Sequence, residues 1–101
     1  MYIIIWEFQP KRGFEKEFQA AYNADGVWAQ FFKKGKGFVR TELFRDTSSE
    51  TRFLTMDYWS SQETYEAFRA QHVSQYQVID KQCESLIVRE THIGSFTINP
   101  K

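Results

Sequence analysis

The stretch FLTMDYWSSQETYEAFRAQH, residues 53–72, decides the fold of this chain. Its first seven residues are mostly apolar or aromatic, which is typical of a buried strand. Two serines come next, and a serine here favours the start of a helix because its hydroxyl accepts a hydrogen bond from a free backbone N–H. Tyr65, Phe68 and His72 then recur at helical spacing. The stretch therefore predicts a strand that passes directly into a helix.

Capping residues predict where two of the helices begin. Ser60 or Ser61 is expected to cap the helix after the buried strand, and Glu63 stands three residues after Ser60, as in a capping box. Asp25 is expected to cap a shorter helix around residues 28–32.

The rest of the chain completes an alternating pattern of strands and helices. Strands are predicted at residues 2–9, 38–46, 51–59 and 87–96. Helices are predicted at residues 14–22 and 28–32 and from 60 to about 83, with a break between 72 and 74. The order β-α-β-β-α-β with a four-stranded antiparallel sheet is the ferredoxin-like α+β fold. We expect one domain over residues 1–97, followed by a loose tail at 98–101.

The helices of such a fold cover only one face of the sheet. In the first strand, Ile3 and Ile5 point to one face, while Ile4 and Phe8 point to the other. Apolar side chains therefore lie on both faces, and we expect a second copy of the chain to cover the free one. A monomer with one exposed apolar face is the alternative.

Composition excludes several classes of partner. Thirteen basic residues balance thirteen acidic ones, so there is no electrostatic reason to expect nucleic acid or an acidic membrane surface. No run of eighteen apolar residues is present, which argues against a membrane span. Cys83 is the single cysteine, so no intrachain disulfide forms. With no signal-peptide pattern at the start, we expect a cytoplasmic protein.

The chain resembles the antibiotic-biosynthesis-monooxygenase-like family of dimeric α+β barrel proteins. Three segments carry the resemblance, namely YIIIWEF at 2–8, GFVRTELFRD at 37–46 and LTMDYWSSQETYEAFRAQH at 54–72. The resemblance implies two sheets stacked into a barrel across a homodimer, with a pocket between sheet and helices in each subunit. Family activities include cofactor-independent oxidation of polycyclic phenols, quinol oxidation, haem degradation and an isomerase-like reaction. Some relatives have no known activity.

The resemblance also suggests which residues form the pocket. Trp59 and Tyr65 fall where members that act on aromatic polyketides carry a pocket Trp and Tyr. Thr55 stands where those members have an Asn, and Phe68 is expected to bind substrate beside them. The Arg that those members carry further along the second helix has no counterpart here. Plain core packing is the alternative for Trp59 and Tyr65.

Two titratable residues are candidates for proton transfer or charge pairing. His72 is expected to act as the proton acceptor, with Tyr65, because the ordinary pKa of histidine lies near neutrality. A surface or helix-capping histidine is the alternative. Asp57 interrupts an apolar strand, and a buried carboxylate needs a partner. We expect an ion pair with Arg40 or Arg89, and a carboxylate that faces the pocket is the alternative.

The sequence argues against metal and cofactor sites. Two histidines and one cysteine, far apart along the chain, match no recognised metal site, so no metal is expected. Haem-degrading relatives need an Asn in the first strand, which is absent, and a Trp where this chain has Phe68. Their histidine ligand would fall near Val78 and Ile79. We therefore expect an enzyme that needs no cofactor.

These observations predict a monooxygenase-like enzyme that acts with O2 on a small aromatic or quinol-type substrate. Such an enzyme must supply a dry pocket and hydrogen bonds to the substrate oxygens. Two alternatives are a non-catalytic module that binds a small ligand and a dimer whose interior is packed shut. A cavity below ~300 Å³ would leave no room for a typical small-molecule ligand.

Overall fold

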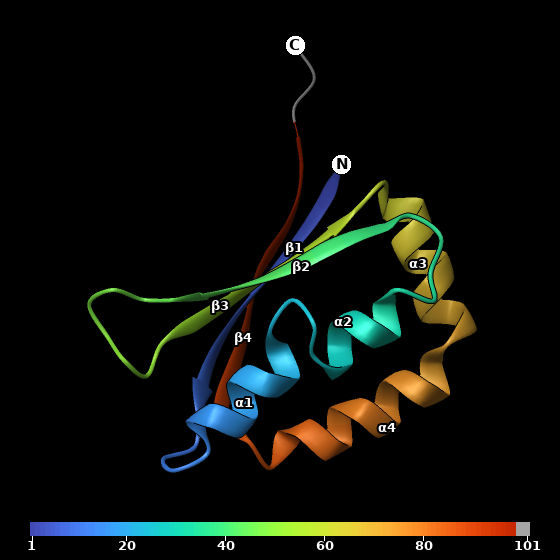
Figure 1. Ribbon diagram of the computed structural model, residues 1–101. Helices are drawn as coiled ribbons and strands as arrows, with labels where there is room; N and C mark the ends of the chain where they lie inside the picture. Colours follow the sequence, from blue (N-terminus) through green and yellow to red (C-terminus); the bar gives the residue numbers. More distant parts are fainter. Residues whose placement is uncertain (99–101) are drawn as a thin grey trace.

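A computed structural model of the chain describes residues 1–98, in which a four-stranded antiparallel sheet supports four helices (Figure 1). The strands are β1 (Tyr2–Pro10), β2 (Phe38–Arg45), β3 (Phe53–Trp59) and β4 (Ile87–Thr97). The helices are α1 (Glu15–Tyr22), α2 (Val27–Phe32), α3 (Gln62–Gln71) and α4 (Val73–Glu84). This arrangement confirms the predicted ferredoxin-like α+β fold. Most of the expected tail, residues 99–101, lies outside the described residues.

The sheet has the strand order β2-β3-β1-β4, and its register decides which side chains meet. β1 pairs with both β3 and β4, and β2 pairs with β3. Ile4 lies opposite Asp57, and Trp6 lies opposite Thr55. Because directly paired residues point to the same face, these four side chains share the face that the helices cover.

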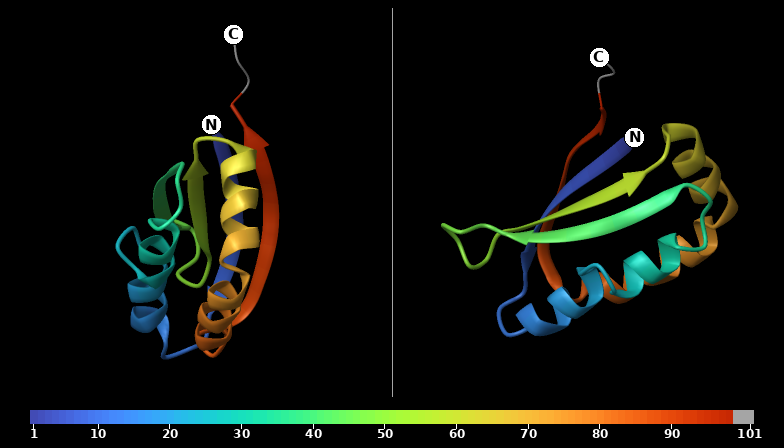
Figure 2. Two further views of the ribbon diagram at one scale, coloured as in Figure 1. Left: turned by 90° about the vertical axis from the view of Figure 1, so that its right-hand side faces the viewer. Right: turned by 45° about the horizontal axis from the view of Figure 1, so that its top comes forward.

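The helices lie on one side of the sheet and leave the other side free, as Figure 2 shows. The strands alternate accordingly, and in β3 every second side chain, beginning with Phe53, is buried beneath the helices. The opposite face, here called the outer face, carries apolar side chains that no element of residues 1–98 covers. They are Ile3, Ile5, Phe44, Leu54, Met56, Tyr58 and Phe96. The predicted division of apolar residues between two faces is therefore confirmed.

The junction at residues 59–61 forms as predicted, and the cap is Ser61, one of the two serines expected. Trp59 ends β3, and Ser61 caps α3 by accepting a hydrogen bond from the backbone N–H of Thr64 at 3.2 Å. The predicted capping box of Ser60 and Glu63 is wrong, since the cap lies one residue later. As a result, Thr64 takes the third helical position, and its own hydroxyl donates to the Ser61 carbonyl at 2.8 Å.

Two further expectations concern helix ends. The expected Asp25 cap of α2 is wrong, because Gly26 is the capping residue and no side chain bonds to the helix start. A Cβ at Gly26 would clash with the backbone carbonyl of Ala21, so only glycine fits where α2 turns back against α1. The predicted helix break is confirmed at His72, which separates α3 from α4 and has a non-helical backbone.

Aromatic rings fill the core between sheet and helices. Phe18 and Trp59 are both 0% exposed and are the largest fully buried side chains of the core. Phe18 packs against Phe8, Tyr22 and Phe53, with ring centres 4.6–5.6 Å apart. None of the helices within residues 1–98 combines the length and apolarity that a membrane span requires.

Candidate functional site

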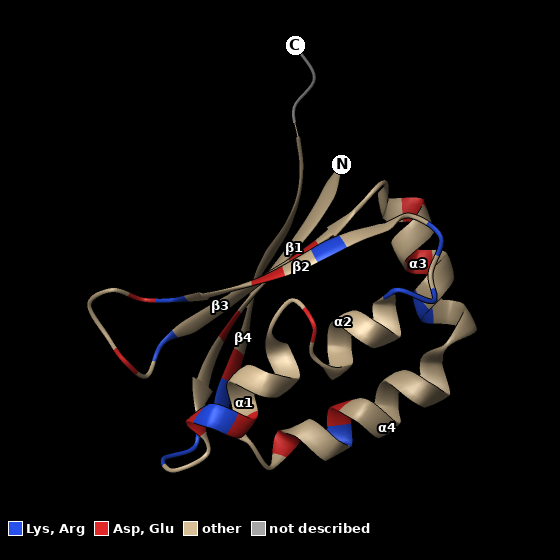
Figure 3. Cartoon of the chain, viewed as in Figure 1, with Lys and Arg blue, Asp and Glu red and all other residues tan. Residues whose placement is uncertain are grey.

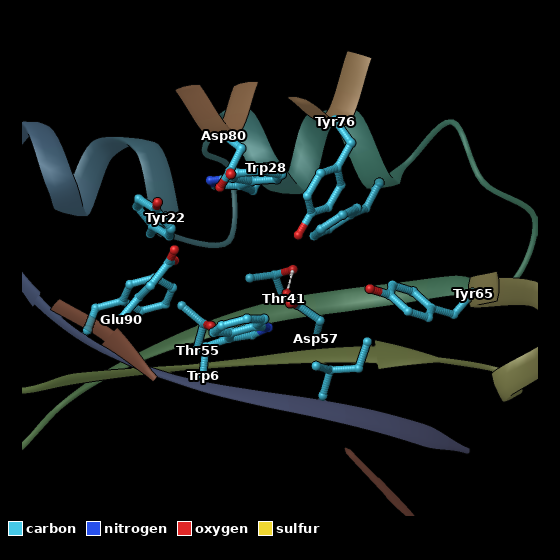
Figure 4. A pocket seen from close by; sticks show the side chains of 13 residues that line it. Trp6, Tyr22, Trp28, Thr41, Thr55, Asp57, Tyr65, Tyr76, Asp80 and Glu90 are labelled. Atoms are coloured by element: carbon cyan, nitrogen blue, oxygen red, sulfur yellow. Dashed lines mark hydrogen bonds between the residues drawn. The ribbon is translucent and has the colours of Figure 1, made fainter. Parts of the chain in front are cut away.

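A cavity of about 130 Å³ lies between the covered face of the sheet and the helices (Figure 4). Every strand and every helix contributes at least one side chain to its wall, because the sheet curves around the helical layer. The lining residues are Ile4, Trp6, Phe8, Tyr22, Trp28, Phe32, Thr41, Thr55, Asp57, Tyr65, Tyr76, Asp80 and Glu90. The wall is thus mostly aromatic, with a few polar groups at defined places, as in many small-molecule sites.

Asp57 is the buried carboxylate of this cavity. It is 8% exposed, and its Oδ1 accepts a hydrogen bond of 2.6 Å from the Thr41 hydroxyl. Thr41 lies directly opposite Asp57 in the β2–β3 pair, so the sheet register itself makes this contact. Within residues 1–98, Thr41 is the side chain that hydrogen-bonds to Asp57, and the second carboxylate oxygen remains available to a ligand.

The expected ion pair of Asp57 with Arg40 or Arg89 is wrong, and a β-bulge explains the error for Arg40. At the start of the β2–β3 pair, Phe38 lies opposite Trp59, and regular pairing would then bring Arg40 opposite Asp57. Val39 is instead an extra residue, so Arg40 moves to the outer face. There its guanidinium lies 3.9 Å from the centre of the Tyr58 ring. Arg89 forms no ion pair within the described part of the chain.

Burial changes the acidity of Asp57. Loss of contact with water raises the pKa of its carboxyl from 3.8 to about 6, and the hydrogen bond from Thr41 opposes only part of this change. The carboxylate is therefore ionised at neutral pH, yet it holds a proton far better than an ordinary aspartate. A pKa close to the working pH is what a general base requires.

Tyr65 presents its hydroxyl to the same part of the cavity as Asp57 and Thr41 (Figure 4). Arg69, one turn further along α3, donates a hydrogen bond of 2.9 Å from Nη1 to the Tyr65 oxygen. Burial raises the pKa of Tyr65, so its O–H stays protonated and can donate to a ligand oxygen. The Arg69 guanidinium also lies 3.8 Å from the centre of the Tyr76 ring and so braces two walls at once.

The structure brings two of the five expected site residues to the cavity. Thr55 and Tyr65 line it, together with Asp57. Trp59 and Phe68 do not line it; they are 0% and 3% exposed and pack in the core. His72 does not line it either, because the helix break turns its ring onto Phe68, with ring centres 4.6 Å apart.

Several lining residues were not recognised from the sequence. Trp6 and Trp28 resemble ordinary core residues when only their spacing is known. Asp80 and Glu90 fall on exposed positions of α4 and β4, where charged residues are common. Arg69 could have been found from its spacing, since residues four apart on a helix are neighbours and Tyr65 was already a candidate.

Within residues 1–98, no three His, Cys, Asp or Glu side chains are grouped so that they could hold a metal ion. The three carboxylates of the cavity wall are spread over both ends of it (Figure 4).

The sequence and the fold of this chain are similar to those of known proteins. The family model described as antibiotic biosynthesis monooxygenase matches residues 1–77. No curated protein sequence matches the chain. Because the solved structures compared below share 20% identity or less with the chain, their likeness shows a common fold.

One of these structures is a variant of SnoaB, a cofactor-independent oxygenase from Streptomyces nogalater. It is 20% identical with a TM-score of 0.71, and the match covers 99% of this chain and 94% of SnoaB. Two proteins that carry the family name are also similar. The one from Deinococcus radiodurans is 13% identical with a TM-score of 0.74, covering 100% and 95% of the two chains. The one from Bordetella bronchiseptica is 16% identical with a TM-score of 0.73, covering 98% and 97%.

Proposed function

This chain belongs to the antibiotic biosynthesis monooxygenase family, and from that premise we propose that it is a cofactor-independent oxygenase of a small, single-ring phenol or hydroquinone. The observation that carries this assignment is the buried carboxylate of Asp57, which faces an aromatic cavity beside the hydroxyl of Tyr65. Such a cavity can remove a proton from a phenol and hold the resulting anion away from water.

The chemistry follows from the positions of the polar groups. Asp57 accepts the proton of the phenol, and Tyr65 donates a hydrogen bond to the phenolate oxygen, while Arg69 holds Tyr65 in place. The electron-rich ring then bonds to one oxygen atom of O2 at a free ring carbon, which is para to the hydroxyl in phenol and ortho to a hydroxyl in hydroquinone. Loss of the proton on that carbon and cleavage of the O–O bond release water and leave a quinone. The substrate supplies all the electrons, so phenol and O2 give benzoquinone and water, and hydroquinone and O2 give hydroxybenzoquinone and water.

His72, the base expected from the sequence, packs on Phe68 rather than at the cavity, so the proposed mechanism gives the proton-accepting role to Asp57. Trp59 and Phe68 would act indirectly, by fixing the core against which Tyr65 rests. The ring centres of Trp59 and Tyr65 are 5.4 Å apart in an edge-to-face arrangement.

The size of the cavity restricts the substrate. Its volume of about 130 Å³ is below the ~300 Å³ of typical ligand pockets. An apolar cavity of ~150 Å³ is known to bind benzene, so one ring fits where fused rings do not. A cavity this small is also what the packed-shut alternative predicts, so the decisive experiment must measure binding as well as turnover.

Replacing Tyr65 with phenylalanine is expected to lower kcat/KM for hydroquinone oxidation by about 10–100-fold, because a hydrogen bond to a charged oxygen is lost. Oxygen consumption and quinone absorbance measure the effect. Tyr58→Phe is the matched control, since Tyr58 lies on the outer face and should leave the rate unchanged. Uptake no faster than in the buffer blank would remove the enzymatic assignment. Hydroquinone binding without uptake would support the non-catalytic ligand-binding alternative instead.

We also propose that a second copy of the chain covers the outer face. Burial of its apolar side chains would close two sheets into one barrel. Met56→Glu places an unpaired charge on this face in both copies and should weaken the dimer by about 100-fold or more. Analytical ultracentrifugation measures the change, with Gln77→Glu on the exposed side of α4 as the control. A wild-type protein that sediments as a single protomer would contradict the dimer.

A further inference from the structure

We propose that the cavity prefers an aromatic ring that carries a cationic amine over a neutral or anionic ring of the same shape. Among the residues that line it, three are acidic and none is Lys or Arg. This inference assigns the substrate class of the site described above and rests on the proposed function only in that it concerns the same site.

Two of the three carboxylates gather at one end of the cavity. Asp80 belongs to α4 and Glu90 to β4, and Figure 3 shows acidic residues on both of these elements. An irregularity in the β1–β4 register places Glu90 opposite Phe8, so that it points to the covered face of the sheet. Burial raises the pKa of Glu90, and the negative charges of Asp80 and Glu84 raise it further; these like charges are the part that would stabilise a cation there.

Aromatic rings surround the same end. Tyr22 and Trp28 have ring centres 6.3 Å apart, and Trp28 and Tyr76 have ring centres 5.1 Å apart. All three rings line the cavity beside Asp80 and Glu90. The face of an aromatic ring attracts a cation, and tryptophan does so most strongly. Rings and carboxylates together therefore form the surroundings that an ammonium group prefers.

The two ends of the cavity suit the two ends of one ligand (Figure 4). Asp57 and Tyr65 lie at the end that would take the phenol hydroxyl, and Asp80 and Glu90 lie at the end that would take the amine. Arg69 is a basic residue that contacts two of the lining side chains. It lies behind the walls that Tyr65 and Tyr76 form, and it is already engaged with both.

The test compares three ligands that share a phenol ring and differ in charge. They are 3-(aminomethyl)phenol, 3-(hydroxymethyl)phenol and 3-hydroxybenzoate, which are a cation, a neutral molecule and an anion near pH 7.5. Titration calorimetry should show the cation binding about tenfold more tightly than the neutral ligand, and the anion binding more weakly still. Equal binding of cation and neutral ligand, tightest binding of the anion, or no binding of the cation would overturn the inference.

Two variants test whether Glu90 and Asp80 cause the preference for the cationic ligand. Glu90→Gln and, independently, Asp80→Asn should each lower the ratio of cation to neutral affinity by about threefold or more. Glu17→Gln, on the exposed side of α1 and outside the cavity wall, is the matched control and should leave the ratio unchanged. If neither cavity variant changes the ratio, the carboxylates are not the cause and the inference fails.

Failure of this inference is distinguishable from failure of the proposed reaction. Oxygen consumption with hydroquinone, which carries no amine, tests the reaction by itself. Uptake without a preference for the cation would overturn the inference alone. A preference for the cation without uptake would overturn the reaction alone.

Discussion

Replacing Asp57 with asparagine is expected to lower kcat/KM for phenol oxidation by about 10²–10⁴-fold, the usual contribution of a general base. The amide cannot accept the proton, although its carbonyl oxygen can still accept the hydrogen bond from Thr41. In the wild type, kcat/KM should rise with pH through an inflection near 6, where the buried carboxyl loses its proton. The inflection should disappear in the variant.

The same substitution is expected to stabilise the protein at neutral pH. The pKa of Asp57 rises from 3.8 in an exposed aspartate to about 6 in the fold. Between these pH values the folded state binds more protons than the unfolded state, so stability falls as pH increases. Above pH 6 the buried charge destabilises the fold by up to about 3 kcal/mol, and the amide removes this penalty.

Urea unfolding measures both parts of the stability prediction. Asp57→Asn should unfold at a higher urea concentration than the wild type at pH 7.5, and the gain should vanish below about pH 4. Asp25→Asn, in the exposed turn before α2, is the control and should change stability little at either pH. A variant that is less stable at pH 7.5 would show that the carboxylate contributes to the fold and is not held there at a cost.

Trp59→Ala is expected to cost about 3–5 kcal/mol of unfolding free energy, the range for removal of a buried aromatic side chain. Trp59 is 0% exposed, and four aromatic ring centres lie 5.2–5.8 Å from its own. A Cβ on Gly35 would come within 3.0 Å of the Trp59 ring, so the loop after α2 packs directly on the indole. The cavity left by alanine therefore cannot close without moving β3, α2 and α3.

A comparison of variants separates packing from ligand binding at this position. Trp59→Phe should cost less than Trp59→Ala, since it keeps one six-membered ring and the indole N–H that it removes has no partner within residues 1–98. Trp6→Ala, at a half-buried position in the cavity wall, should destabilise the fold less but weaken ligand binding more. If Trp59→Ala left stability intact and abolished binding, Trp59 would belong to the site and not to the core.

The elements of the fold could be predicted from the sequence because their causes lie within a few residues of each other. Alternating apolar residues in FLTMDYW define a strand with two faces, and the serines that follow define a helix start. Even the break at His72 follows from local pattern. Ser61, one of the two serines expected to cap α3, is the cap, whereas the cap of α2 is Gly26 and not the neighbouring Asp25, since the choice between neighbours depends on how the chain packs.

The candidate site could be predicted only in part. Thr55 and Tyr65 were found through family resemblance, and strand alternation places Thr55 on the buried face. The sequence marks Asp57 as unusual, but it does not reveal the partner of the carboxylate. That partner depends on a single extra residue, Val39, which moves Arg40 to the outer face and brings Thr41 to the carboxylate. No sequence pattern within β2 predicts the bulge.

The sequence by itself determined the order of elements, the two-faced sheet and the membership of Asp57 in a buried strand. All of these follow from short-range periodicity. Only the tertiary structure decided that Asp57 has a hydroxyl and not a guanidinium beside it. It also decided that Asp80 and Glu90 line the same cavity as Asp57. The physical reason is that register, bulges and helix packing bring together residues far apart in the chain, and burial then sets the charge that each of them can hold.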